Sequence, residues 1–101
     1  MILYNVTVNI DVEKEKEYVE WMKTVHIPEV MATKLFEDSK FYKLLHEVED
    51  GGVNYSAQYF AKSMKEIHQY QADFAVNLQN KLKDKFGNQY AVFRSLLELV
   101  E

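Results

Sequence analysis

The sequence predicts a single α+β domain in which one antiparallel sheet carries helices on one face. Its length of 101 residues suits one domain with one hydrophobic core. Apolar and polar residues alternate near the amino terminus, which is typical of a half-buried strand, whereas apolar residues recur every three or four positions in the second half, which is typical of a helix. A composition that is 48% hydrophobic and 28% charged is that of a folded chain rather than a disordered one.

Residues 2–10 are predicted to form the first strand, because apolar and other side chains alternate throughout this stretch. A strand of this kind has one dry face, which we expect to lie against the helices. The predicted dry face consists of Ile2, Tyr4, Val6, Val8 and Ile10.

The first helix is predicted to begin after Asp11, which suits an N-cap, and to end near His26. Pro28 sets this end, because proline lacks a backbone donor and disfavours helical geometry at the residue before it. Proline suits the first position of a helix, so a short extra helix is predicted over residues 28–36.

A hairpin is predicted from two strand-like runs, residues 39–48 and 53–59, with a turn signal at residues 50–52. In the first run the sequence leaves open which side chains face the core. Phe41 and Leu45 form one candidate set. Tyr42, Leu44, His46 and Val48 form the other.

A long helix and a final strand complete the chain. Ser63 and Glu66 have the spacing of a capping box, so the helix should begin after Ser63. Apolar residues continue at helical spacing up to Leu82, and Gly87 suits the left-handed position that ends a helix. Residues 90–97 then alternate as the last strand.

This order of elements predicts a ferredoxin-like βαββαβ sandwich over residues 1–101: a four-stranded antiparallel sheet with two main helices on one face and a short extra helix after the first. The other sheet face is open. We expect it to carry Asn5, Gln58 and Arg94, with apolar side chains that favour a homodimer. These apolar side chains are predicted to be Leu3, Tyr90, Val92 and Leu96.

Charge and composition disfavour several classes of function. A net charge of −4 opposes binding to nucleic acid and to anionic membranes, and residues 53–60 lack the basic and aromatic signature of an RNA-recognition strand. The chain has no cysteine and no histidine–glutamate spacing typical of zinc, so neither a metal nor a cofactor is expected. The first residues do not resemble a secretion signal, which predicts a cytoplasmic protein.

The segment Trp21-Met22-Lys23-Thr24-Val25-His26-Ile27-Pro28-Glu29, within this order of elements, resembles the dimeric α/β-barrel superfamily. It is similar to a segment of the branch associated with ethyl tert-butyl ether degradation, and the chain looks nearest to an uncharacterised bacterial family. The resemblance implies paired sheets, His26 at a cavity mouth and Asn5 lining the cavity. The superfamily includes cofactor-free monooxygenases, isomerases and haem-degrading enzymes. The second half lacks a clear tryptophan and histidine pair, which argues against haem degradation.

His26 is the candidate catalytic residue, because imidazole titrates near neutrality; the alternative is a histidine that simply favours a helix end. The candidate binding residues are Asn5, Trp21, His46, Gln58 and Arg94, although Asn5 and Gln58 also suit mutual pairing.

The sequence therefore favours a module that binds a small molecule or a protein, since no set of acid, base and nucleophile is evident. The alternative is a cofactor-free enzyme, monooxygenase-like or isomerase-like, in which His26 transfers a proton while Asn5 and Arg94 stabilise negative charge. A role in protein interaction alone would require exposed apolar surface on the long helix.

Overall fold

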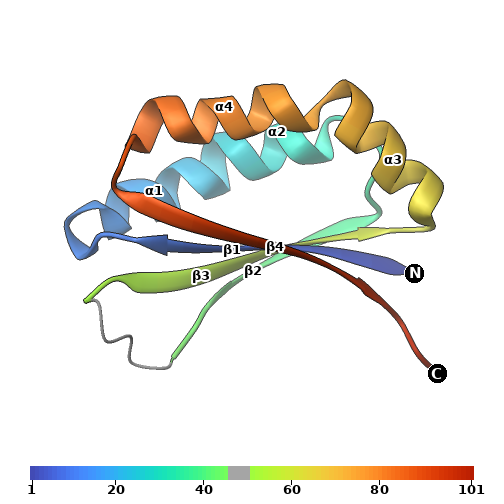
Figure 1. Cartoon of the computed structure of the whole chain (residues 1–101), viewed down its shortest axis with the longest axis horizontal. Helices are drawn as coiled ribbons and strands as arrows, with labels where there is room; N and C mark the ends of the chain where they lie inside the picture. The colour runs from blue at the N-terminus through green and yellow to red at the C-terminus, as the bar shows by residue number, and fades with distance from the viewer. Residues whose placement is uncertain (46–50) are drawn as a thin grey trace.

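The predicted ferredoxin-like fold is confirmed by the computed structural model, which describes residues 1–45 and 51–101. All helices lie over one face of the sheet (Figure 1). The antiparallel strands, in the order β2-β3-β1-β4, are β1 (Ile2–Ile10), β2 (Asp38–Lys43), β3 (Val53–Ala61) and β4 (Tyr90–Glu98). The helical segments are the 3₁₀ turn η1 (Val12–Lys14), α1 (Glu15–Trp21), the π-helix η2 (Met22–His26), α2 (Ile27–Met31), α3 (Met64–Asp73) and α4 (Ala75–Phe86).

The register of β4 against β1 corrects the predicted facing of the last strand. Val92 lies opposite Val8 and Arg94 lies opposite Val6, so both point toward the helices with the predicted dry face of β1. The prediction that Arg94 lies on the open face is therefore wrong. The same holds for Tyr90, Val92 and Leu96; the open face of β4 instead carries Ala91, Phe93, Ser95 and Leu97.

The register of β2 settles the ambiguity in the hairpin. Phe41 lies opposite Ala57 and packs on the core, with its ring 6.2 Å from that of Tyr18. Tyr42 lies opposite Ser56, on the open face. β2 ends at Lys43, so the prediction that the strand continues through Leu44 and Leu45 is wrong. The rest of the predicted strand and the start of the turn fall at residues 46–50, outside the described residues.

The elements α1, η2 and α2 form one continuous run, the first helical layer. The prediction that a helix ends near His26 is therefore wrong. α1 passes into the π-helical turn η2 and then into α2, and the N–H of Ile27 donates to the carbonyl of Met22, five residues back. A π-helical turn shifts hydrogen-bond partners by one residue, which accommodates Pro28 because proline has no N–H to donate. The predicted short helix is correspondingly brief and ends at Met31.

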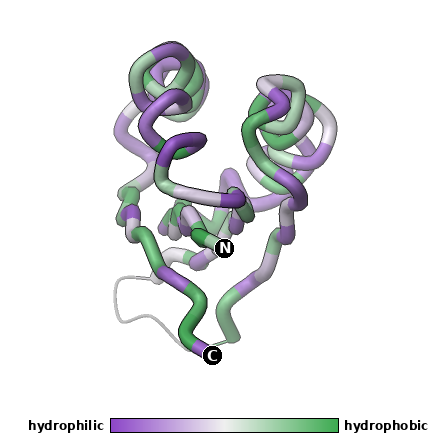
Figure 2. The backbone as a smooth tube through the Cα atoms, turned by 90° about the vertical axis from the view of Figure 1, so that its right-hand side faces the viewer, coloured by the Kyte–Doolittle hydropathy of each residue, from purple (hydrophilic) through white to green (hydrophobic). Residues whose placement is uncertain are grey.

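The second helical layer, formed by α3 and α4, begins and ends as predicted, but it bends in the middle. Ser63 is the N-cap of α3, and Gly87, with φ of +57°, follows α4. At Phe74 the backbone leaves helical geometry, with φ of −129°, and divides α3 from α4. The two layers stand side by side above the sheet (Figure 2). None of the helices in residues 1–45 and 51–101 is both long and apolar enough to cross a bilayer.

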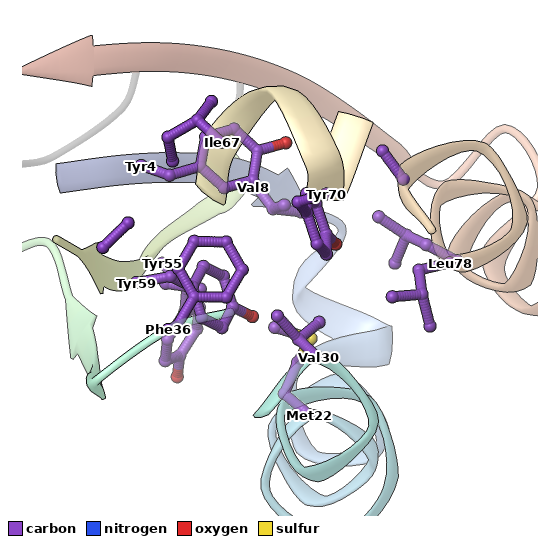
Figure 3. Packing of buried hydrophobic residues seen from close by; sticks show 14 of the residues in the cluster. Tyr4, Val8, Met22, Val30, Phe36, Tyr55, Tyr59, Ile67, Tyr70 and Leu78 are labelled. Carbon is purple, nitrogen blue, oxygen red and sulfur yellow. The ribbon is translucent and has the colours of Figure 1, made fainter. Parts of the chain in front are cut away.

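Two groups of aromatic side chains fill the space between the layers and the sheet. The first joins Tyr4, Phe36, Tyr59 and Tyr70, whose ring centroids lie 5.1–6.3 Å from one another in the contacting pairs. The second surrounds Tyr18, which contacts Phe41, Tyr55 and Phe86. In Figure 3, Met22 and Val30 project from the first layer and Leu78 from the second, toward the shared interior.

Replacing Ser63 with alanine is expected to lower the free energy of unfolding by about 0.5–2 kcal/mol. The Ser63 hydroxyl donates to the carboxylate of Glu66 and no side-chain hydrogen bond reaches the helix backbone, so a loss near the lower end is expected. Urea denaturation measures it. An unchanged midpoint would mean that the hydroxyl does not help to start α3.

Candidate functional site

A small cavity lies inside the domain, between the sheet and the two helical layers. Its volume is about 30 Å³, enough for a water molecule but not for an organic ligand. Apolar walls come from Val8, Val30 and Leu78, among others, and both aromatic groups reach it, the first through Tyr4 and the second through Tyr18. The cavity therefore lies where β1, the first helical layer and α4 meet.

His26 contributes an imidazole to the wall of this cavity. Its Nδ1 atom is buried and has no hydrogen-bond partner among residues 1–45 and 51–101. One side of the ring stacks on Trp21, with centroids 4.7 Å apart and planes 24° apart, and Trp21 in turn packs edge-on against Phe86. The stack positions the imidazole and leaves a polar atom without a protein partner at the cavity.

Burial lowers the pKa of His26 to about 4, so the imidazole is neutral at pH 7. Glu29 raises this pKa, whereas Lys81 and Arg94 lower it. Glu29 and Lys81 form an ion pair 2.5 Å long, so their effects largely oppose each other. Arg94 thus remains the charged neighbour whose influence on His26 is not balanced by an ion-pair partner.

Arg94 occupies the mouth of the cavity. Its side chain lines the cavity and also a surface groove of about 290 Å³. Among residues 1–45 and 51–101 it forms no ion pair and no side-chain hydrogen bond. Its charge also opposes the effect of burial, which raises the pKa of Tyr70. The guanidinium is therefore placed to act on groups within the cavity.

The groove adjoins the cavity near β4. Tyr4, Gln79 and Arg94 line both spaces, and Gln71 and Leu96 contribute to the groove. Because the same three side chains border both spaces, small movements of them would join the groove to the cavity. The arrangement offers a route from the surface to His26.

The two predicted amide residues lie on the opposite, open face of the sheet. Asn5 and Gln58 face each other across β1 and β3 and are bridged by Ser56, whose Oγ donates to Asn5 Oδ1 (2.5 Å) and accepts from Gln58 Nε2 (3.4 Å). Asn5 Nδ2 also donates to Thr7 Oγ1 (3.0 Å) and Ser95 Oγ (3.4 Å). Asn5 is not among the residues that line the inner cavity, and Arg94 lies on the other face of the sheet, so the predicted grouping of Asn5 with Arg94 on one face is wrong.

The structure thus brings together His26 and Arg94, supported by Trp21, and separates them from Asn5 and Gln58. His46 lies outside the described residues. Sequence reasoning missed Tyr70 and Gln79, which the second helical layer brings to the cavity. In the sequence, Tyr70 follows the apolar period of its helix and is typical of a core residue, whereas Gln79 is typical of a surface residue. Neither pattern indicates a place at a functional site.

Known proteins resemble this chain both in sequence family and in fold. The family described as "Domain of unknown function (DUF4286)" matches residues 1–100. A dimeric ferredoxin-like protein from an uncultured marine organism has a TM-score of 0.72 and 15% identity, covering 100% of this chain and 96% of that protein. No curated protein matches the sequence.

Two further solved structures carry names from the predicted superfamily. An ethyl tert-butyl ether degradation family protein from Bacillus halodurans has a TM-score of 0.67 and 13% identity, covering 99% of this chain and 100% of that protein. A putative antibiotic biosynthesis monooxygenase from Deinococcus radiodurans has a TM-score of 0.61 and 12% identity, covering 100% and 94%. These likenesses confirm the predicted resemblance in fold, and the chain belongs to the DUF4286 family of domains of unknown function.

Proposed function

We propose that this protein is a homodimeric module that binds a small molecule between its sheet and its helices. The observation that carries the proposal is that His26 lines a cavity and has a buried Nδ1 atom without a hydrogen-bond partner among the described residues. A buried polar atom without a hydrogen bond is costly, and a ligand atom would satisfy it. The groove shared by Tyr4, Gln79 and Arg94 supports an entry route.

The ligand would enlarge the inner cavity as it enters. The cavity of about 30 Å³ and the groove of about 290 Å³ are separate spaces in the unliganded protein, and a compact ligand would need both. Binding pockets for small molecules have volumes of about 300–1,000 Å³. The expected ligand is therefore a small one that lies mostly in the groove and extends one polar group to His26.

A fragment screen followed by thermal shift tests the binding role. Binding fragments should raise the melting temperature of the wild type and should lose this effect in His26→Gln, because a ligand stabilises the protein that binds it. His68→Gln is the matched control, because His68 is exposed on α3 and does not line the cavity. Fragments that stabilise the wild type and His26→Gln equally would contradict binding at His26.

The dimer is proposed to form through the open face of the sheet. Relatives of this fold are described as dimeric ferredoxin-like proteins. On this face the chain exposes Tyr42 (50%), Phe93 (68%) and Leu97 (48%), around a polar centre that includes Asn5. Protein interfaces are enriched in aromatic side chains and also contain hydrogen-bonding groups.

Light scattering is expected to give twice the 12.0 kDa mass of one chain. Phe93→Asp should raise the dimer dissociation constant at least about tenfold, because it places a charge within the apolar part of the interface. The matched control is Val76→Asp, since Val76 is similarly exposed (64%) but lies on α4, on the helix side. A 12.0 kDa mass for the wild type at every concentration would contradict the dimer.

A second candidate is a cofactor-free enzyme in which His26 transfers a proton, and the specific support is a neutral imidazole close to Arg94. His26 would accept a proton from a C–H next to a carbonyl, and Arg94 would stabilise the negative charge that moves onto the oxygen. Return of the proton to another carbon would complete an isomerisation. In a monooxygenase, molecular oxygen would be the oxidant and would add to the same carbanion. The peroxide would take up the proton held by His26 and lose water together with the second hydrogen of that carbon, which leaves a new carbonyl.

Deuterium exchange tests the enzymatic candidate. Phenylpyruvate in D₂O should lose its benzylic C–H signal faster with the wild type than with His26→Gln, by about 100-fold or more, which is the usual contribution of a general base. Proton NMR follows the signal. Equal rates with both proteins would remove His26 as a base and leave the binding role in place.

A further inference from the structure

The mouth of the cavity carries a positive charge, that of Arg94, which no carboxylate of the described residues pairs with. No aspartate or glutamate belongs to the described lining of the cavity or of the groove, whereas Arg94 lines both. The nearby cation Lys81 is different, because it pairs with Glu29 at 2.5 Å. An arginine that lacks an ion-pair partner at the entrance of a cavity without carboxylates favours an anionic ligand.

The groups beyond Arg94 indicate what the rest of the ligand contains. Tyr4 lines both the groove and the inner cavity, and Tyr59 and Tyr70 line the inner cavity. His26 also lines the inner cavity, and its buried Nδ1 has no hydrogen-bond partner among the described residues. Aromatic walls favour a flat, unsaturated body that packs against the rings. A second polar atom on the ligand would form a hydrogen bond with the imidazole.

We propose that the ligand is a small organic carboxylate that lies mostly in the groove, where its anionic group pairs with Arg94 and its unsaturated body lies against Tyr4. This inference rests on the binding role proposed above and narrows it to one chemical class. The planar guanidinium matches a carboxylate, because two parallel N–H groups can donate to its two oxygens. The groove of about 290 Å³ limits the ligand to a compact molecule.

Benzoate and benzamide are the probes, because they share a shape and differ in charge. Affinity is measured by titration calorimetry with the wild type, Arg94→Gln and Lys81→Gln. Lys81→Gln is the matched control: it removes one positive charge near His26 from a residue that does not line the cavity. Circular dichroism and thermal melting show whether each variant is folded.

Benzoate is expected to bind the wild type at least about tenfold more tightly than benzamide does. Arg94→Gln should abolish this preference, because the affinity for benzoate should fall at least about tenfold while the affinity for benzamide changes little. Lys81→Gln should preserve the preference.

Three results would overturn the anionic class: equal affinity of the two probes for the wild type, unchanged benzoate affinity in folded Arg94→Gln, or no benzoate binding up to about 10 mM. The fragment screen distinguishes this failure from failure of the binding role. Neutral fragments that depend on His26 but not on Arg94 would keep the binding role and reject the carboxylate.

Discussion

Replacing Tyr18 with alanine is expected to lower the free energy of unfolding by about 3–5 kcal/mol, as for other large aromatic residues removed from a core. Tyr18 is 0% exposed, and its ring contacts Phe41, Tyr55 and Phe86 at centroid distances of 5.6–6.2 Å. The substitution would remove the ring that packs between α1, β2, β3 and α4. Urea denaturation measures the change.

Tyr18→Phe is the matched variant, because it keeps the ring and removes the hydroxyl. That hydroxyl is buried without a hydrogen-bond partner among the described residues. An unsatisfied buried polar group costs about 1–3 kcal/mol, so Tyr18→Phe should be as stable as the wild type or more stable. A loss above about 1 kcal/mol would show that the hydroxyl has a partner, such as a water molecule in the cavity.

Lowering the pH from 7 to 4 is expected to reduce stability through His26 by up to about 3 kcal/mol. Burial lowers its pKa in the folded protein from 6.5 to about 4. Between these values the unfolded chain binds more protons, so stability is complete above pH 6.5 and declines as the pH falls toward 4. The charged groups that act on His26 are Glu29, Lys81 and Arg94.

Comparison with His26→Gln isolates this contribution, since carboxylates also titrate in this range. The free energy of unfolding of the wild type should fall more steeply between pH 6.5 and 4 than that of the variant. NMR titration of the His26 ring protons gives the pKa directly. Parallel stability curves, or a pKa near 6.5, would show that the imidazole is not buried against the cavity.

The proposed ligand site and the proposed dimer surface lie on opposite faces of the same sheet. The cavity lies beneath the helices, where Val6 and Arg94 pair across β1 and β4, whereas Phe93 and Asn5 belong to the open face. The residues that line the cavity lie on the helix side of the sheet, away from Phe93. A monomeric Phe93→Asp variant should therefore still bind fragments at His26, which separates the two roles experimentally.

The sequence by itself determined the elements whose signals are local. Residues 2–10 alternate so regularly that the strand and its dry face follow from side-chain period alone. Ser63 and Gly87 mark the limits of the second helical layer, because the spacing of Ser63 to Glu66 and the positive φ that glycine tolerates are both local signals. With the order of elements, these signals were enough for the fold.

Only the tertiary structure decided which face of β4 meets the helices. Both faces of this strand carry large apolar side chains, Tyr90 and Val92 on one and Phe93 and Leu97 on the other, so period alone could not choose. Pairing with β1 determines the facing of β4, and it places Arg94 on the helix side of the sheet. A single reversal of facing thus changed the expected composition of both the site and the dimer surface.

The surroundings of His26 were equally a tertiary result. Its motif suggested a helix end, where an imidazole would be exposed and charged, but the π-helical turn continues the helix past Pro28 and directs the ring inward. Burial and the charge of Arg94, which is 68 positions away along the chain, then keep it neutral. Local sequence determines where a strand or helix forms, whereas the polarity around a side chain depends on elements that meet only in the folded protein.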